Sequence, residues 1–325
     1  MEEYGPTGKR EAQPKRPLIS LEIEDHIRHN CRIKTYPDGS AVVLVADRAI
    51  FREPGWDELG HGSEQRAAQR LLARLAAMDR REPVELSQYA IARAEAEDEA
   101  RAAESLARAQ RRARNAVRDL ALSNDFRFFV TFTLNAEKVD RYDVREITRK
   151  LNAWLDNRVR RDGLAYVLVP ERHKDGALHF HGLINAALPV SDSGTIDRGK
   201  GKPQRPRSAA QREKWLAEGG HVVYNLPAWT LGFSTAIELY GERRAAVSYV
   251  CKYIAKQQRG DGTPGKIGGR WYYSGGALRR PSVTFADVDR NDFDALTGFE
   301  FVVDGLGARC KIIEAEGGEK SGCDA

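Results

Sequence analysis

Short apolar runs rich in β-branched and aromatic residues alternate with polar segments and predict strands along much of the chain. The predicted strands are 126–134, 164–170, 178–185 and 229–239, with a shorter one at 269–275. Nearer the start, 31–51 alternates around Pro37-Asp38-Gly39, and this turn signal predicts a β-hairpin.

Apolar residues recur at helical spacing in 139–161 and 243–257, which predicts one helix in each segment. A region rich in Ala, Arg, Glu and Leu predicts two more helices, 63–80 and 87–122, with Pro83 between them. The long, charged second helix has only a thin apolar stripe, which favours a solvated helix or a packing and self-association arm over direct DNA contact. Its residues that could touch phosphates are Arg108, Arg111, Arg112 and Arg114.

The order of these elements is β-α-β-β-(insertion)-β-α-β, which predicts an α+β fold with one sheet backed by helices. We place this domain at 121–285 and interpret 191–220, rich in Gly, Pro, Arg, Lys and Ser, as an exposed insertion. The remaining segments are a flexible tail at 1–17, a hairpin and helical region of unknown role at 18–120, and an acidic segment at 286–325.

Charge is distributed unevenly along the 325 residues. The chain has 52 Lys and Arg against 47 Asp and Glu, a net charge of +5. Residues 286–325 hold ten acidic and four basic residues, a net −6, so the preceding residues carry +11. A basic body indicates a polyanionic partner such as nucleic acid, although a solvated basic surface gives the same charge.

Other features of the sequence exclude several classes of protein. The longest apolar runs are far too short to span a bilayer, and the first residues lack the apolar stretch of a secretory signal. The four cysteines are far apart, with no CxxC pair, which argues against a disulfide framework and a structural zinc site. We therefore expect a cytoplasmic protein with no membrane partner.

His179-Phe180-His181 lies in a predicted strand, where alternation puts both imidazoles on one face. Two such histidines can hold one metal ion, although an isolated HxH is more often a chance pair on a half-buried strand. Glu171 ends the preceding strand and can supply a carboxylate as third ligand, with His173 and Asp175 as alternatives. Phosphate chemistry favours Mg²⁺ or Mn²⁺ at such a site.

A second cluster lies in the predicted helix at 243–257. Tyr249, Lys252, Tyr253 and Lys256 share one helical face by spacing, while a separate apolar face is free to pack on the sheet. We expect both tyrosines to project with the lysines; the alternative is that they pack at the edge of the core. A phenol has a pKa of about 10, so its use as a nucleophile needs positive charge nearby.

Three motifs follow one another in the chain: FVTFTLN, in which Thr131 and Thr133 share a strand face, then HFHGL, then YVCKYIAK. Together they resemble the HUH endonucleases, specifically the rolling-circle replication initiators of small single-stranded-DNA phages and related plasmids. GRWYYSGGALRRP, at 269–281, is similar to the strand that commonly follows the tyrosine helix in the phage initiators. The resemblance covers about 126–281 and gives no counterpart for the N-terminal helical region.

The resemblance implies a small antiparallel sheet flanked by helices and a metal-dependent, site-specific DNA nicking and joining enzyme of the bacterial host cytoplasm. His179, His181 and Glu171 would hold Mg²⁺ or Mn²⁺, and Tyr249 and Tyr253 would each attack a DNA phosphate to form a 5′-phosphotyrosyl link. The remaining implied roles are phosphate binding by Lys252 and Lys256 and DNA binding by Thr131, Thr133, Arg270, Trp271 and Tyr272.

The implied partners are single-stranded or origin DNA, a host helicase and a DNA polymerase, and the long charged helix offers a surface for a homo-oligomer. Two alternatives stay open. One is a transposase or relaxase with the same chemistry. The other is a non-catalytic single-strand binder that stacks bases on Phe128, Trp271, Tyr272 and Tyr273.

Overall fold

The computed structural model describes residues 28–52, 88–199, 201–239, 243–257, 262–303 and 307–314. Within these ranges the chain is α+β, with five helices and two large antiparallel sheets, which confirms the expected fold class. The tail at 1–17 and the helix expected at 63–80 lie outside the described residues. No helix in the described ranges has both the length and the apolar character needed to cross a membrane.

The larger sheet is built from residues 128–275. Its strands are β5 (Phe128–Leu134), β6 (Tyr166–Arg172), β7 (Leu178–Ile184), β8 (Ser191–Asp197), β9 (His221–Asn225), β10 (Gly232–Glu238) and β11 (Tyr273–Gly275). They lie in the order β11-β6-β7-β5-β10-β9-β8, with every neighbouring pair antiparallel. The predicted runs thus become β5, β6, β7, β10 and the short β11.

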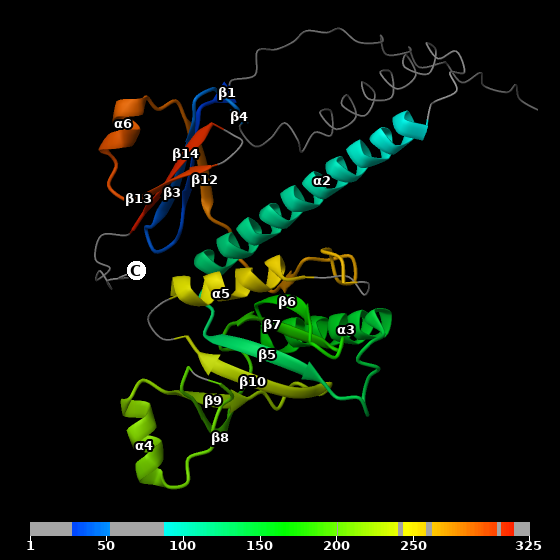
Figure 1. Ribbon diagram of the computed structural model, residues 1–325. Coiled ribbons are helices and arrows are strands. Elements are labelled where there is room, and N and C mark those ends of the chain that lie inside the picture. Colours follow the sequence, from blue (N-terminus) through cyan, green and yellow to red (C-terminus); the bar gives the residue numbers. More distant parts are fainter. Residues whose placement is uncertain are drawn as a thin grey trace, which may run out of the picture.

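Helices cover both faces of this sheet (Figure 1). Helix α3 (Val144–Asp162) packs on one face, where Phe132, Leu168 and Phe180 belong to the largest core cluster. On the other face, Val167 and Val169 pack with α5 (Arg243–Ala255) and with the C-terminal part of α2 (Gln88–Ser123). The α2 helix has 36 residues, and its N-terminal end projects away from the sheet (Figure 1). The long helix expected at 87–122 is therefore confirmed.

Helix α3 begins later than the apolar spacing indicated. We expected its start at residue 139, but it begins at Val144 because Asp143 caps it by accepting hydrogen bonds from the amides of Arg145 and Glu146. Val139 is still buried, in the turn that precedes the cap. Its apolar character reflects core packing without a helical backbone.

A second sheet joins the two ends of the described chain. Its strands, in spatial order, are β12 (Ser282–Ala286), β2 (Cys31–Thr35), β3 (Ala41–Ala46), β14 (Ala308–Ile313) and β13 (Phe299–Val303). The expected hairpin is confirmed as β2 and β3, whose turn places Gly39 at φ 82°. Helix α6 (Arg290–Ala295) covers this sheet through Phe293, and β1 (Arg28–His29) pairs with β4 (Phe51–Arg52) beside it.

Two expected segments contain more structure than their composition indicated. The segment 191–220 is exposed along most of its length, but it supplies strand β8 at the sheet edge and helix α4 (Ala209–Ala217). The segment expected to be an acidic tail from residue 286 supplies α6, β13 and β14, and the expected boundary at 285 falls inside β12. Charge and glycine content did not reveal these elements, because their pairing partners are distant in sequence.

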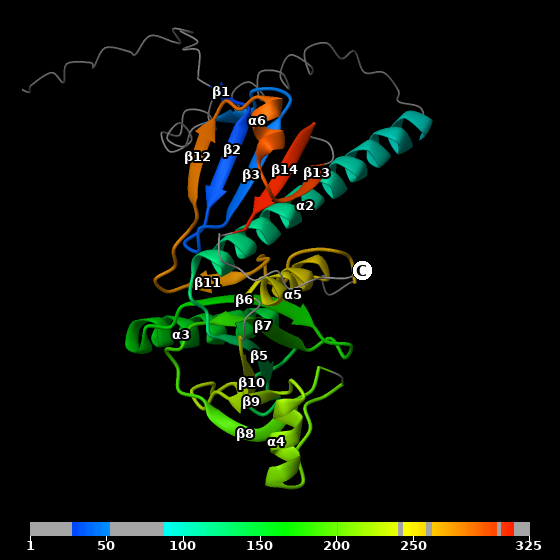
Figure 2. The ribbon, with the colours of Figure 1, turned by 90° about the vertical axis from the view of Figure 1, so that its left-hand side faces the viewer.

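The five-stranded sheet rests against α2, which runs between the two sheets (Figure 2). Tyr36 is buried in the same cluster as Val117 of α2, and its hydroxyl donates a hydrogen bond of 2.9 Å to Asp119. The Lys34 ammonium group also binds Asp119, so that this carboxylate holds two side chains of the hairpin. The hairpin is thereby fixed to the helix that packs on α5.

Candidate functional site

Two threonines of β5 face the two histidines of β7 across the sheet. Thr131 is the register partner of His181, and Thr133 is the register partner of His179. The threonine hydroxyl lies 3.0 Å from Nδ1 in the first pair and 3.2 Å from it in the second. Because both Nδ1 atoms are engaged by β5, Nε2 is the nitrogen that each imidazole can offer to a metal ion.

Glu171 approaches the histidines from β6. It is the register partner of His179, and its Oε2 atom lies 2.8 Å from Nε2 of His181. The side chains of His181 and Glu171 are 12% and 27% exposed, so the pair is accessible at the sheet surface. The two other candidate carboxylate or imidazole ligands, Asp175 and His173, pair with each other at 3.3 Å.

This donor set matches a metal site in chemistry and only partly in arrangement. Two imidazoles and one carboxylate on one sheet face are suitable ligands for a divalent ion with open positions. Among the residues that the structure describes, however, no three His, Cys, Asp or Glu side chains are arranged to hold a metal ion. Glu171 is bound to His181, and the His179 ring stacks on His173 with 5.1 Å between centroids. Ligation by all three would need His179 and Glu171 to turn toward a shared ion.

The pKa of His179 is lowered mainly by burial, and also by the neighbouring imidazoles of His173 and His181. A lowered pKa keeps this imidazole neutral at neutral pH, and the neutral form is the one that binds metals. The electrostatic environment of His179 therefore agrees with a ligand role.

Gly182 completes the HFHGL motif for a steric reason. It lies between Val130 of β5 and Leu168 of β6 in the sheet register. A Cβ atom at this position would come within 1.9 Å of the Val167 carbonyl oxygen. Glycine is therefore required for β6 to approach β7 closely enough to bring Glu171 beside the histidines.

The tyrosine helix α5 lies directly over this polar face. Its Val247, Val250 and Ile254 are buried, as the apolar spacing predicted. The ring of Tyr253 stacks on His181 with 4.0 Å between centroids and an interplanar angle of 6°. The Tyr253 hydroxyl donates a hydrogen bond of 2.8 Å to the Tyr249 hydroxyl. The chain thus links the histidine strand to both tyrosines through direct contacts.

The two tyrosines differ in exposure, which corrects the expectation that both project from the helix. Tyr249 is 48% exposed, whereas Tyr253 is 8% exposed and belongs to the core cluster under α5. Burial raises the pKa of Tyr253 well above its ordinary value, and the bond to Tyr249 and the Glu171 charge raise it further. Tyr253 is buried because its position on α5 faces His181, and helical spacing alone cannot show that contact.

Lys252 and Lys256 are exposed on the same side of α5 as Tyr249, as their spacing predicted. The helix therefore presents one accessible hydroxyl and two ammonium groups to solvent beside the histidines. This combination can bind an anion such as a phosphate diester at the mouth of the site.

Two glutamines that the sequence did not reveal hold the end of α5. Gln110 of α2 donates to the carbonyls of Ile254 and Ala255, at 3.0 and 3.3 Å. Gln257 is 2% exposed and donates to the carbonyls of Pro170 and Trp271. These bonds satisfy backbone groups near the helix end and tie the tyrosine helix to β6, the strand of Glu171. Glutamine has no sequence signal that would predict such distant partners.

The segment expected to bind DNA after α5 is only partly accessible. Trp271 is 7% exposed within the core under α5, so it is a core residue and not a surface for base stacking. Tyr272 is half-buried at that cluster, and Arg270 lies over the ring of Tyr273, which belongs to the core under α3. Phe128 and Tyr273 are also buried, so three of the four aromatic residues of the stacking alternative cannot serve as platforms.

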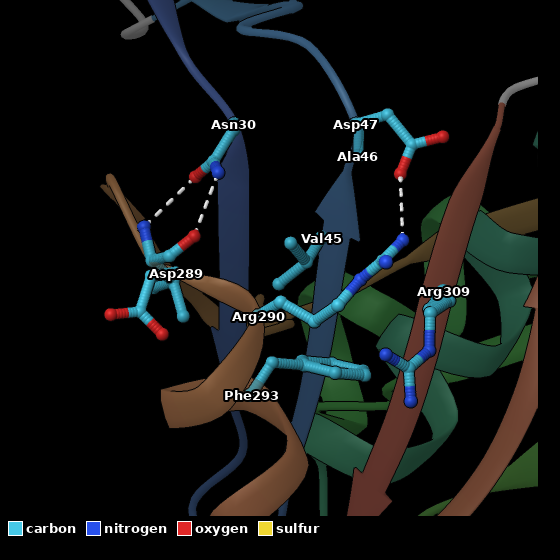
Figure 3. A pocket seen from close by; sticks show the side chains of 9 residues that line it. Asn30, Val45, Ala46, Asp47, Asp289, Arg290, Phe293 and Arg309 are labelled. Atoms are coloured by element: carbon cyan, nitrogen blue, oxygen red, sulfur yellow. Dashed lines mark hydrogen bonds and ion pairs between the residues drawn. The ribbon is translucent and has the colours of Figure 1, made fainter.

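The five-stranded sheet has a cavity of its own, with a volume of about 390 Å³ (Figure 3). Arg290 crosses its mouth toward Asp47, with 3.9 Å between the charged groups, and Phe293 forms its floor. Asn30 binds the backbone of Val288 at one side of the cavity and Arg309 lies at the other. The lining includes none of the histidine, tyrosine or threonine residues of the site above.

Residues 127–258, less than half of the chain, match the sequence model of a family described as replication-associated proteins of the ORF2 and gene 2 protein type. No curated protein and no solved structure matched the chain in the corresponding searches. The matched segment includes β5, β6, β7 and α5, and therefore the threonines, the histidines, Glu171 and both tyrosines. The match supports a Rep-like protein of DNA replication that binds DNA, and it is compatible with an endonuclease.

Proposed function

We propose that the chain is a rolling-circle replication initiator of the two-tyrosine HUH type, which nicks one DNA strand and later rejoins it. The observation that carries this proposal is the contact between the tyrosine helix and the histidine strand, where Tyr253 stacks on His181 and binds Tyr249. A phenol nucleophile and a metal-ligating imidazole must lie this close to act on one phosphate. The family match to residues 127–258 supports the same class of protein.

Tyr249 makes the first attack, because its hydroxyl is on the accessible side of α5 and that of Tyr253 is buried. Its oxygen attacks the scissile phosphorus, and the bond from phosphorus to the 3′-oxygen breaks. The tyrosine proton is transferred to the departing 3′-oxygen, which leaves a 5′-phosphotyrosyl link and a free 3′-hydroxyl. One phosphodiester replaces another, so the reaction needs no external energy and is reversed when a 3′-hydroxyl attacks the link.

Tyr253 provides the second nucleophile. While Tyr249 carries the first strand, Tyr253 can cut the regenerated origin, and the released 3′-hydroxyl then closes the displaced strand into a circle. The free 3′-hydroxyl from the first cut is the substrate of a DNA polymerase. We therefore assign strand separation and synthesis to a host helicase and polymerase.

His179, His181 and Glu171 would hold the divalent ion, Mg²⁺ or Mn²⁺, which when bound would polarise the scissile phosphate. The threonine hydroxyls orient the two imidazoles through their Nδ1 atoms. Lys252 and Lys256 neutralise the phosphate that Tyr249 attacks, and the sheet face excludes water from the stacked side of His181. The accessible side of the site remains open to a DNA strand.

The test uses overlapping single-stranded oligonucleotides that tile the DNA around the gene, each incubated with the protein and Mn²⁺. We expect one oligonucleotide to give a covalent protein–DNA adduct on a denaturing gel, with a free 3′-hydroxyl on the released fragment. The Tyr249→Phe/Tyr253→Phe variant should give no adduct, and Tyr142→Phe, which removes an exposed hydroxyl from another part of the surface, should match the wild type.

Persistence of the adduct in the double variant would overturn the tyrosine assignment. DNA binding without any adduct from the full set of oligonucleotides would instead favour a non-catalytic single-strand binder.

A further inference from the structure

Three arginines form a row on α2 at the junction of the two sheets. Arg111, Arg114 and Arg118 are spaced at i, i+3 and i+7, so they lie on one side of the helix and span about 10 Å. All three side chains are exposed, and none of them has an ion pair with another described residue. We refer to these residues as the arginine row.

Other arginines of α2 are already paired within the helix. Arg101 binds Glu97 and Asp98, and Arg108 binds Glu104 at 3.4 Å. The carboxylate nearest the row in sequence, Asp119, is occupied by Lys34 and Tyr36 of the hairpin. The row therefore keeps its positive charge free for an external anion.

The arginine row adjoins the tyrosine helix. The Cys251 thiol of α5 lies 3.6 Å from the Arg114 carbonyl oxygen, and the charges of Arg114 and Arg118 act on that thiol. Lys252, the next residue of α5, is exposed and shares a helical face with Tyr249. Positive charge thus continues from the row through Lys252 to the accessible tyrosine.

We propose that Arg111, Arg114 and Arg118, continued by Lys252 and Lys256, bind the phosphate backbone of the DNA strand that enters or leaves the site at Tyr249. This inference rests on the proposed function and adds the path of the substrate. Exposed arginines on a rigid helix bind phosphates without reading bases, so the row supplies affinity and orientation and leaves sequence choice to other contacts.

The test measures binding of a fluorescent single-stranded dT30 oligonucleotide over a range of salt concentrations, in EDTA so that no cleavage occurs. Each phosphate contact contributes about 0.7 to the slope of log K against log salt for single strands. The Arg111→Gln/Arg114→Gln/Arg118→Gln variant should therefore lose about 2 units of slope. At 0.1 M salt it should bind about 10–100-fold more weakly.

The matched control is Arg145→Gln/Arg149→Gln/Arg161→Gln, which removes three exposed arginines from α3 on the opposite face of the sheet. It changes the net charge by the same amount and should keep the wild-type slope. A second variant, with lysine at the three positions of the row, keeps the charge and should retain most of the slope. Loss of slope in the lysine variant, or equal loss in the α3 control, would overturn the proposal.

The binding and cleavage proposals fail in different experiments. A normal covalent adduct together with an unchanged slope in the row variant would overturn the arginine row alone. A reduced slope in a protein that forms no adduct would support the row as a nucleic-acid surface and overturn the nicking activity.

Discussion

The two sheets use polar residues in opposite ways. In the five-stranded sheet, the buried ammonium group of Lys311 donates to the carbonyls of Phe293, Asp294 and Leu296, and so closes the end of α6. In the seven-stranded sheet, the polar residues of β5, β6 and β7 bind one another's side chains at an accessible surface. Polar groups that bind backbone atoms stabilise the fold, whereas side chains that bind one another beside a nucleophile form a site.

The sheets also differ in how they support α2 and α5. The seven-stranded sheet contacts α5 directly and carries the histidines beneath it, while the five-stranded sheet reaches α2 through Tyr36 and Lys34. We infer that chemistry belongs to the larger sheet and that the smaller sheet acts as a support. The following predictions test that division, from the largest expected effect to the smallest.

Phe293→Ala should destabilise the five-stranded sheet most strongly. Phe293 is 1% exposed against Cys31 and Val43, and removal of such a side chain costs about 3–5 kcal/mol of unfolding free energy. Urea denaturation measures the loss. Adduct formation per folded molecule should remain, and a complete loss of adduct in folded protein would contradict the division between the sheets.

Thiol labelling can localise the effect of that substitution. Burial raises the pKa of Cys310 to about 11, so its thiol should react slowly at pH 8 in the wild type. In a Cys323→Ser background, Phe293→Ala should speed the labelling of Cys31 and Cys310 and leave Cys251 of α5 slow. Equal acceleration at all three thiols would show that the two sheets open together.

His179→Ala should reduce cleavage by about 10²–10³-fold, equivalent to about 2.7–4 kcal/mol. This histidine is the better test of metal binding because its ring, unlike that of His181, does not stack on Tyr253. Adduct formation at increasing Mn²⁺ concentrations measures the effect, with His221→Ala on β9 as the control. Cleavage that survives His179→Ala would rule out the proposed metal site.

Thr131→Val should weaken the response to metal by about 10–100-fold, since the hydroxyl orients His181 through its Nδ1 atom. Valine keeps the shape and the strand preference of threonine, so the unfolding free energy should change little. The readout is the Mn²⁺ concentration that gives half-maximal adduct. An unchanged value would show that the pairing of Thr131 and His181 has no part in metal binding.

Gln110→Ala should have the smallest effect, about 1 kcal/mol of unfolding free energy, because it leaves two carbonyls of α5 without their donor. A looser tyrosine helix should also slow adduct formation by a few fold. Gln110→Glu, which keeps the size but loses the amide donor, should behave in the same way. If the glutamate variant were as stable and as active as the wild type, the hydrogen bonds of Gln110 would not position α5.

The sequence predicts the larger sheet well because its strands lie close together in the chain and have strong apolar patterns. Strand alternation placed His179 and His181 on one face, and the order of motifs brought Thr131, Thr133 and Glu171 into consideration. The buried position of Tyr253 was missed, because a helical face can pack on a polar residue that the local pattern does not include.

The smaller sheet could not be predicted in the same way. Its β2 and β3 were visible as a hairpin, but their partners β12 and β14 lie more than 230 residues later. The acidic composition after residue 286 concealed strands whose apolar residues, such as Ala308 and Cys310, are few and small. Long-range pairing of short strands leaves no local signal, so it became visible only in the fold.

The most direct test of the central claim is to identify the residue that carries the DNA. The wild-type protein would be incubated with its reactive oligonucleotide and Mn²⁺, digested with nuclease and protease, and the nucleotide-linked peptide sequenced by mass spectrometry. We predict a single linked residue, Tyr249, with linkage at Tyr253 only when a second cleavable strand is supplied. Linkage at any residue outside α5 would contradict the account.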